Sequence, residues 1–320
     1  MDVVITWVDG DDPRHIARRR AHLAPGAEAT SGANPTRFAS RDEIFFCLSS
    51  IFRFAPFVER IHIVTDDQIP PCLNSLSELF PDQIGKVRIV DHKEIFRGHE
   101  ECLPTFNSIS IAAMLHRIEG LAREYVYFND DVVLLRPVAP TDFFLNGAPV
   151  IRAQRALLLP LGLDRLMGWL EFPRGRISFK GAQRRAARLS GARWRYLRHD
   201  HTPHPFRRST LETFYAAHPD LLIQNACHKF RSAEQFGNAA IAYHLEYMSG
   251  NTEVAPTRLV YLRPVKDADH QAYLRRKLAE CADPSRLFAC FQSLDMLDQI
   301  ALGIATNWLQ RHLGVTRDAA

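Results

Sequence analysis

Short apolar runs alternate with segments of helical periodicity over the first half of the chain. The runs are rich in β-branched and aromatic residues, which is typical of strands buried on both faces. Between them, residues 41–54 and 108–121 place apolar side chains three and four positions apart, as an amphipathic helix does. Strands that alternate with helices predict an α/β fold with a mainly parallel sheet flanked by helices. The predicted strands are residues 3–8, 60–65, 86–90 and 125–128.

Each predicted strand is followed by an acidic or amide residue. The carboxyl ends of parallel strands meet at one edge of a sheet, where ligands of open α/β folds collect. The fourth run ends on Asn129, Asp130 and Asp131, and the apolar pattern resumes at Val132. Adjacent carboxylates there suit Mg²⁺ or Mn²⁺, and such an ion binds a diphosphate. On residue types alone, an Asn-Asp-Asp turn between two hairpin strands is an equally good interpretation.

The second half of the chain carries two further features. The segment 150–200 is rich in basic residues and predicts a mostly helical insertion into a single domain that spans 1–320. Residues 287–313 place apolar side chains at helical spacing, which predicts a C-terminal helix within 285–315. A stripe of this kind favours docking on the core or on another domain over insertion into a membrane.

The net charge of +4 is unevenly distributed. Between Arg174 and Arg208 stand eleven Lys and Arg against the single acid Asp200, a balance of +10 that leaves −6 for the rest. Such a block is most often a solvated surface; the functional alternative is a site for an anionic polymer or a peripheral contact with the inner membrane. Trp194 and Tyr196 stand between these arginines, but no nucleic-acid-binding module surrounds them, so we expect no nucleic acid partner.

The composition is that of an ordinary globular chain, with 320 residues, 46% hydrophobic and 24% charged, enough for a large core. The six cysteines are scattered without the paired spacing of a metal site, which predicts reduced thiols and a cytoplasmic protein. The chain opens on Met1 and a strand-like run, and it nowhere has about 18 consecutive apolar residues. We therefore expect neither a signal peptide nor a transmembrane helix.

Several motifs in a fixed order resemble one family. They are DVVITWVDG at 2–10, RFASRDEIFFCLSSI at 37–51 and RIHIVTDDQIPPCL at 60–73, followed by LPTFNS, YFNDDV, HDHTPHPF and HKFRSAEQF. Together they resemble the Stealth proteins from Asp2 to about Met248. That family comprises bacterial polysaccharide phosphotransferases and the α/β subunit of the lysosomal-enzyme N-acetylglucosamine-1-phosphotransferase. The resemblance implies a Rossmann-like, glycosyltransferase-A-like catalytic domain.

The resemblance also implies a reaction. Such enzymes take a nucleotide-sugar, typically a UDP-sugar, and pass the sugar-1-phosphate to an acceptor hydroxyl of a polysaccharide or glycan. The product is a phosphodiester in a capsular polysaccharide or exopolysaccharide, and nucleoside monophosphate is released. Three alternatives remain open: a metal-dependent glycosyltransferase, a nucleotide-sugar hydrolase and a catalytically silent nucleotide-sugar-binding protein. Their products, or the lack of any, distinguish them.

Phosphoryl transfer needs positive charge near the phosphates, a base for the acceptor hydroxyl and hydrogen-bond donors to the migrating phosphoryl group. The resemblance implies residues for each. Asp130 and Asp131 would hold the Mg²⁺ or Mn²⁺ ion, with Asp131 also catalytic. His201 or His204 would be the base, because an imidazole titrates near the working pH. Arg231 would clamp the migrating phosphoryl group with its planar fork. Helix capping by the histidines and an ordinary surface ion pair of the arginine remain alternatives.

Other polar residues stand at predicted strand ends, at a helix start or in the shared motifs, where the uridine, ribose or phosphates of a donor would bind. Their ordinary roles would be turns, caps and solvent-exposed pairs. The predicted substrate-binding residues are Asp9, Gly10, Arg37, Glu43, Thr65, Asp66, Asn107, Arg117 and Asn129.

Two motifs depart from the family pattern. In the second motif, residues 39–41 read Ala-Ser-Arg where the family has Arg-Asp-Asn, so the chemistry of this loop differs. In the C-terminal motif, the usual Asn-Asp positions hold Gln292 and Ser293. We therefore expect no metal ligand from the C-terminal region.

Overall fold

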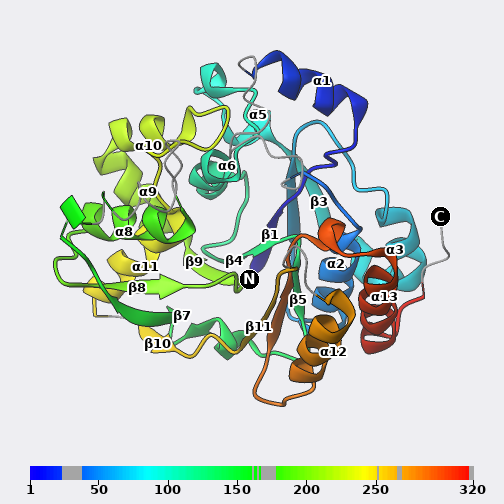
Figure 1. Cartoon of the computed structure of the whole chain (residues 1–320). Coiled ribbons are helices and arrows are strands. Elements are labelled where there is room, and N and C mark those ends of the chain that lie inside the picture. Colours follow the sequence, from blue (N-terminus) through cyan, green and yellow to red (C-terminus); the bar gives the residue numbers. More distant parts are fainter. Residues whose placement is uncertain are drawn as a thin grey trace.

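A computed structural model describes residues 1–23, 38–160, 162–163, 166, 178–250, 252–264 and 269–316 (Figure 1). Its central element is a five-stranded sheet in the order β3-β2-β1-β4-β9. In this sheet β1 pairs in parallel with β2 and β4, β2 pairs in parallel with β3, and β9 runs antiparallel to β4. The predicted mainly parallel α/β sheet is confirmed. The strands are β1 (Asp2–Thr6), β2 (Ile61–Thr65), β3 (Val87–Asp91), β4 (Glu124–Asn129) and β9 (His204–Arg207).

Helices cover both faces of this sheet, because its strands are apolar on both sides. In β1, Val3 and Ile5 belong to one buried cluster and Val4 to the other. Figure 1 shows the two groups of helices on opposite sides of the sheet. None of the helices that the structure describes is long and apolar enough to cross a membrane. The first cluster includes residues of α2 (Glu43–Phe54), α3 (Leu73–Leu79), α12 (His270–Cys281) and α13 (Gln299–Leu313); the second includes residues of α5 (His92–Ile95), α6 (Ser108–Met114), α9 (Arg208–Ala217), α10 (Pro219–Ala226) and α11 (Asn238–Met248).

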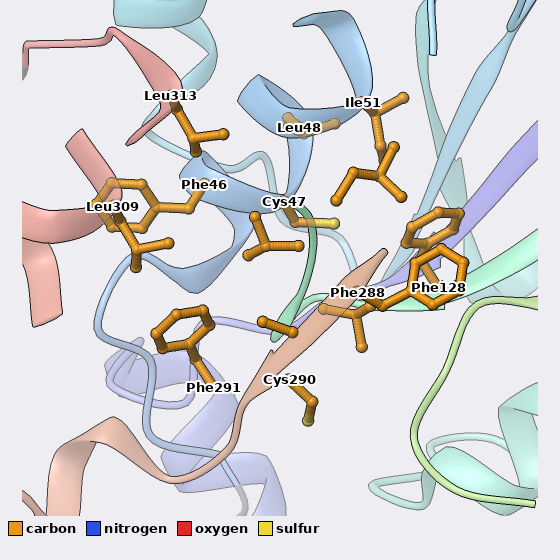
Figure 2. Packing of buried hydrophobic residues seen from close by; sticks show 14 of the residues in the cluster. Phe46, Cys47, Leu48, Ile51, Phe128, Phe288, Cys290, Phe291, Leu309 and Leu313 are labelled. Carbon is orange, nitrogen blue, oxygen red and sulfur yellow. The ribbon is translucent and has the colours of Figure 1, made fainter. Parts of the chain in front are cut away.

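A second sheet of three strands, in the order β11-β12-β5, extends the first cluster. The middle strand β12 pairs in parallel with β11 and antiparallel with β5, and all four of its residues are buried. Figure 2 shows Phe288 and Phe291 of β12 in the same packed group as Phe46 of α2 and Leu309 of α13. The strands are β5 (Val132–Leu134), β11 (Leu259–Leu262) and β12 (Phe288–Phe291).

The predicted C-terminal helix begins later than the sequence indicates. Residues 288–291 are a strand, because four consecutive buried side chains and pairing on both edges fit a strand buried on both faces. The helix α13 begins at Gln299, where Oδ1 of Asp298 accepts the backbone N–H of Ala301 at 2.8 Å. From there Leu309 and Leu313 pack into the first cluster.

The segment 150–200 is less helical than the sequence predicts. In its described part, β7 (Ala148–Leu157) and β8 (Arg195–His199) form an antiparallel pair, and α8 (Phe179–Leu189) is the helix. The strands are partly exposed: β7 is buried over Pro149–Ala153 and mostly exposed after it, and in β8 Arg195 is exposed whereas Tyr196 and Leu197 are buried. A block of basic residues alone does not distinguish such a half-buried strand from a solvated helix. Two short strands, β6 (Phe144–Leu145) and β10 (Glu253–Ala255), also pair with β7.

Two of the six cysteines are bonded to each other. A disulfide joins Cys102 to Cys227, so the expectation that all six are reduced thiols is wrong for this pair. The two residues are 125 positions apart, and only the fold brings their segments together. The free cysteines, all buried, are Cys47, Cys72, Cys281 and Cys290.

Candidate active site at the edge of the central sheet

The carboxyl ends of β1, β2 and β4 lie at the same edge of the central sheet as the beginning of β9. Because β9 runs antiparallel, Tyr127 near the end of β4 pairs with His204 at the beginning of β9. The acidic turn at 129–131 and the segment that begins at His201 are therefore neighbours. The structure thus brings together two motifs that lie about 70 residues apart in the sequence.

A chain of hydrogen bonds connects β1 to His201. The hydroxyls of Thr6 and Tyr127 lie 3.0 Å apart, and the Tyr127 hydroxyl donates to Oδ1 of Asn129 at 3.0 Å. Nδ2 of Asn129 lies 3.3 Å from Nδ1 of His201. Burial raises the pKa of Tyr127 to about 12, so the hydroxyl keeps its proton. The Asn129 amide is held from one side by Tyr127 and orients the imidazole on the other.

The imidazole of His201 is stacked between two aromatic rings. The centroid of Phe179 is 4.6 Å away and that of Tyr261 is 5.6 Å away, with interplanar angles of 16° and 3°. The Tyr261 hydroxyl donates a hydrogen bond to Oε1 of Gln292. Gln292 is one of the residues that depart from the family pattern, and its amide accepts the hydrogen bond of the Tyr261 ring that stacks on His201. Burial lowers the pKa of His201, against the opposing effect of the Asp131 charge.

His204 and His199 lie deeper than His201. Nδ1 of His204 lies 2.7 Å from the Tyr243 hydroxyl, and burial holds the pKa of His204 well below its usual value. His199 packs edge-on against His204 with centroids 4.8 Å apart, and its buried Nε2 has no hydrogen-bond partner among the residues described. Nothing in the sequence singled out His199, because one more histidine in HDHTPH carries no separate signal. Of the two histidines predicted as bases, His201 is the one beside the acidic turn.

Three carboxyl groups, those of Glu43, Asp130 and Asp131, lie close enough to affect one another. Burial, and then the charges of Asp131 and Glu43, raise the pKa of Asp130 well above its usual value. Burial likewise raises the pKa of Asp131. The pKa of Glu43, at the beginning of α2, is raised to about 7, mainly by burial and in part by the Asp131 charge. A nearby cation would favour the ionised form of all three groups.

The donor atoms at the acidic turn fit a divalent cation. Oδ1 of Asp131 is buried and has no hydrogen-bond partner in the described part of the chain, although buried polar atoms are normally paired. Carboxylate oxygens are the donors that Mg²⁺ and Mn²⁺ prefer. Among the described residues, the only three candidate ligand atoms within 4.8 Å of one another belong to Glu101, Cys102 and Cys227, two of which form the disulfide. The carboxylates at the sheet edge are more widely spaced than that group.

The loops after β1 and β2 are tied together by Gln68. Its side chain accepts from the backbone N–H of Asp9 at 2.9 Å and donates to the Asp9 carbonyl at 3.1 Å and to Oδ2 of Asp12 at 2.9 Å. Position 10 requires glycine because the backbone of Phe38 approaches it closely: a Cβ there would lie 1.9 Å from the carbonyl oxygen of Phe38. Gln68 was not among the predicted site residues, because its role depends on a contact between two loops that the sequence does not reveal.

Thr65 and Asp66 stand at the end of β2. The buried hydroxyl of Thr65 has no hydrogen-bond partner within the described ranges. Asp66 forms an ion pair with Arg18 of α1 (Pro13–Ala21) at 2.9 Å. The charge of Asp66 is therefore compensated within the protein, and Thr65 is the better candidate for a ligand contact.

Arg231 reaches the same edge from the segment after α10. It is exposed, and its Nη2 donates to the hydroxyl of Ser108 at 2.7 Å. Its positive charge adds to the effect of burial in lowering the pKa of His201, and it lowers the pKa of Tyr127 against the larger effect of burial. The arginine is thus close to the two ring side chains at the strand ends.

Two predicted residues do not join this group, and a third lies outside the described residues. Asn107 is fully buried and caps α6, because its Oδ1 accepts the backbone N–H of Ile109 at 3.1 Å. Arg117 donates to the carbonyl of Arg97 and precedes the amino end of β4, away from the carboxyl edge. Arg37 lies outside the described residues. Asn107 and Arg117 thus bond to other parts of the protein in this structure.

Two family descriptions match the chain: Stealth protein CR1, conserved region 1, over residues 1–23, and Stealth protein CR2, conserved region 2, over residues 37–150. An exopolysaccharide phosphotransferase of Streptomyces coelicolor is 35% identical over 270 residues, which are 82% of this chain and 27% of the relative. A capsular polysaccharide phosphotransferase of Actinobacillus pleuropneumoniae is 36% identical over 162 residues, 49% of this chain and 42% of the relative. The chain therefore spans less than half the length of these relatives.

Among solved structures, the galactosyltransferase LgtC in complex with donor and acceptor sugar analogues aligns over 100% of this chain and 98% of its own, with a TM-score of 0.47 and 13% identity. The parallel sheet and its acidic edge define an α/β protein with a candidate active site at the carboxyl ends of its strands. The chain contains the first two conserved regions of the Stealth proteins.

Proposed function

We propose that this protein transfers a sugar-1-phosphate from a nucleotide-sugar, typically a UDP-sugar, to a hydroxyl of a capsular polysaccharide or exopolysaccharide. The observation that carries the proposal is the contact between Asn129 and His201, which places a candidate base beside the acidic turn. The relatives support it, because they are named phosphotransferases of these two kinds of polymer. The acceptor oxygen forms a bond to the sugar-linked phosphorus, the P–O bond from that phosphorus to the bridging oxygen breaks, and the nucleoside monophosphate leaves with the bridging oxygen.

The side chains at the sheet edge divide the work of phosphoryl transfer. Asp130 and Asp131 would hold Mg²⁺ or Mn²⁺, which supplies positive charge against the diphosphate of the donor. Arg231 would donate its two parallel N–H groups to oxygens of the migrating phosphoryl group or of the leaving monophosphate. The Thr65 hydroxyl and the loop at Asp9 would contact the donor at the strand ends. The acceptor hydroxyl must approach in line, opposite the leaving monophosphate.

His201 is the proposed base, and Asn129 decides which ring nitrogen carries the proton. With Nδ2 of Asn129 donating to Nδ1, the neutral ring holds its proton on Nε2. A half-turn of the amide presents Oδ1 to Nδ1, moves the ring proton there and leaves Nε2 free to accept the proton of the acceptor hydroxyl. Tyr127 is compatible with both arrangements, because its hydroxyl donates in one and accepts in the other. The base-competent tautomer therefore requires the turned amide.

Product analysis by mass spectrometry tests the proposal. The protein is incubated with a panel of nucleotide-sugars, an oligosaccharide acceptor and Mg²⁺ or Mn²⁺, and we expect nucleoside monophosphate and a phosphodiester-linked product. Nucleoside diphosphate with a glycosidic product would establish a metal-dependent glycosyltransferase instead. Sugar phosphate released without acceptor would establish a nucleotide-sugar hydrolase, and binding without turnover a catalytically silent protein. The His201→Ala variant, purified in parallel, is the control for contaminating activity.

A further inference from the structure

Large apolar side chains are exposed where β7 ends and β8 begins. Trp194 is 81% exposed and Leu157 is 71% exposed. They lie at the same end of the strand pair, because Leu157 pairs with Arg195, and the carbonyl of Trp194, one residue earlier, accepts the backbone N–H of Leu158 at 2.9 Å. Isolated exposed apolar residues are common, but here two of this size are exposed at one end of a strand pair, Leu157 within β7 and Trp194 in the bend that precedes β8. In Figure 1 these strands lie on the side of the molecule opposite α12 and α13.

Arginines surround these two apolar residues. Arg155, Arg193 and Arg195 are all exposed. Arg155 lies over the ring of Tyr247 at 5.7 Å, and neither Arg193 nor Arg195 has a carboxylate partner among the described residues. The surface formed by these side chains is called the β7–β8 end below. It consists of Arg155, Leu157, Arg193, Trp194 and Arg195.

The arginines of the neighbouring helix α8 are not part of this surface. Arg184 is 9% exposed, and Nη2 of Arg188 donates to the carbonyl of Leu159 at 2.7 Å. Nη1 of Arg185 donates to the carbonyl of Ala233 at 3.4 Å. In the described part of the charge block, the α8 arginines therefore bond to the protein, whereas Arg193 and Arg195 face solvent.

We propose that the β7–β8 end is a docking surface for an anionic lipid bilayer. Tryptophan and arginine together suit a membrane surface, because the indole lies at the headgroup level and the guanidinium groups bind lipid phosphates. Each basic residue near an anionic membrane strengthens binding roughly fivefold. A purely anionic polymer would use the arginines but would gain little from Trp194 and Leu157. The exposed apolar pair therefore favours a membrane over a polyanionic chain.

Vesicle co-sedimentation with the purified chain tests this inference without any activity assay, so its outcome is separate from that of the proposed reaction. We expect binding to vesicles of phosphatidylcholine with phosphatidylglycerol and at least tenfold weaker binding to phosphatidylcholine alone. Trp194→Ala with Leu157→Ser, and separately Arg193→Gln with Arg195→Gln, should each weaken binding at least tenfold. The matched control is Arg275→Gln with Arg276→Gln, which removes two exposed charges from α12 and should bind like the wild type.

A fluorescence measurement on the same samples reports where the indole goes. The chain has four tryptophans, and the emission that shifts to the blue with anionic vesicles should be absent in Trp194→Phe. Equal binding to both vesicle types, no binding to either, or equal losses in the α12 control would overturn the inference. So would an unchanged affinity of the Trp194→Ala, Leu157→Ser protein, since the arginines would then act on any polyanion. Circular dichroism of every variant confirms that the losses do not come from unfolding.

Discussion

Asp131 has a buried carboxylate oxygen, Oδ1, that the described part of the chain leaves without a hydrogen bond. The neighbouring carboxylate of Asp130 repels that of Asp131. The proposed cation would be the missing partner of both carboxylates. The same two side chains are therefore unfavourable for the empty protein and favourable for the loaded one.

Asp131→Asn should lower turnover on the order of 100-fold or more, because it removes a metal ligand and its charge. Its thermal unfolding midpoint should stay unchanged or rise, because a like-charge pair is relieved. Chelation of the wild type should match the loss of turnover. The comparison variant is Asp283→Asn, an exposed acid elsewhere on the surface. Undiminished turnover both in excess chelator and in Asp131→Asn would show that residues 129–131 form a structural turn and bind no catalytic metal ion.

Tyr261 acts through His201. Tyr261→Leu removes the stacked ring, whereas Tyr261→Phe keeps the ring and loses only the bond to Gln292. Misplacement of a catalytic group by about 1 Å costs up to about 100-fold in rate, so kcat should fall most in Tyr261→Leu and little in Tyr261→Phe. The KM for the donor should stay constant in both.

Gln292→Ala provides the internal control for the Tyr261 prediction. It breaks the same hydrogen bond as Tyr261→Phe, so the double variant should be no slower than either single one. Additive losses in steady-state kinetics would mean that Gln292 acts on the site independently of Tyr261.

At the scale of elements, the contacts that hold α1 against the sheet edge include a buried histidine and an ion pair. His15 lies between the rings of Phe38 and Phe106, with centroids 5.7 and 5.3 Å away. Arg18 pairs with Asp66 at the end of β2. The helix thereby covers the segment where the donor side of the site is proposed. Its attachment depends on a neutral imidazole, because a charged one would be buried among aromatic rings.

The docking of α1 should weaken with acid. Burial, and then the charge of Arg19, lower the pKa of His15 to about 4, below its ordinary value of about 6.5. The folded form therefore binds fewer protons than the unfolded one. The stabilisation is complete above about pH 6.5 and is lost as the pH falls toward 4, about 2 kcal/mol by pH 5. Hydrogen exchange of residues 13–21, corrected for intrinsic rates, should accelerate between pH 7.5 and 5.5.

A variant pair isolates the contribution of His15. His15→Phe should remove the acid-induced acceleration in α1, whereas His218→Gln, an exposed histidine at the end of α9, should keep it. The same protection at both pH values in the wild type would mean that another contact holds the helix.

At the scale of the whole molecule, the sequence predicts what depends on local pattern. Apolar runs that end on Asp or Asn predict the parallel strands and the acidic edge, because side-chain period and strand direction determine them. The stacking of Phe179 and Tyr261 on His201 could not be predicted, since the residues come from three separate segments. The strand at residues 288–291 could not be predicted either, because aromatic residues at helical spacing also fit a short buried strand.

The disulfide joins two segments that are far apart in the sequence and that both lead into the candidate site. Cys102 precedes the LPTFNS motif and Cys227 precedes the HKFR motif, and the two segments also bond through Lys229 Nζ and the Leu103 carbonyl at 2.7 Å. Arg231 lies in the second of these segments. A cross-link between residues 125 apart restricts the unfolded chain and typically stabilises a protein by about 2 to 4 kcal/mol.

Reductant should therefore lower the free energy of unfolding of the wild type by about 2 to 4 kcal/mol in denaturant titrations. The double variant Cys102→Ser, Cys227→Ser should start at the lower stability and show no response to reductant, because its remaining cysteines are free. Thiol titration in denaturant provides the direct count: four reactive thiols without reductant and six with it. Six thiols under both conditions, or equal stability with and without reductant, would show that Cys102 and Cys227 are not bonded in solution.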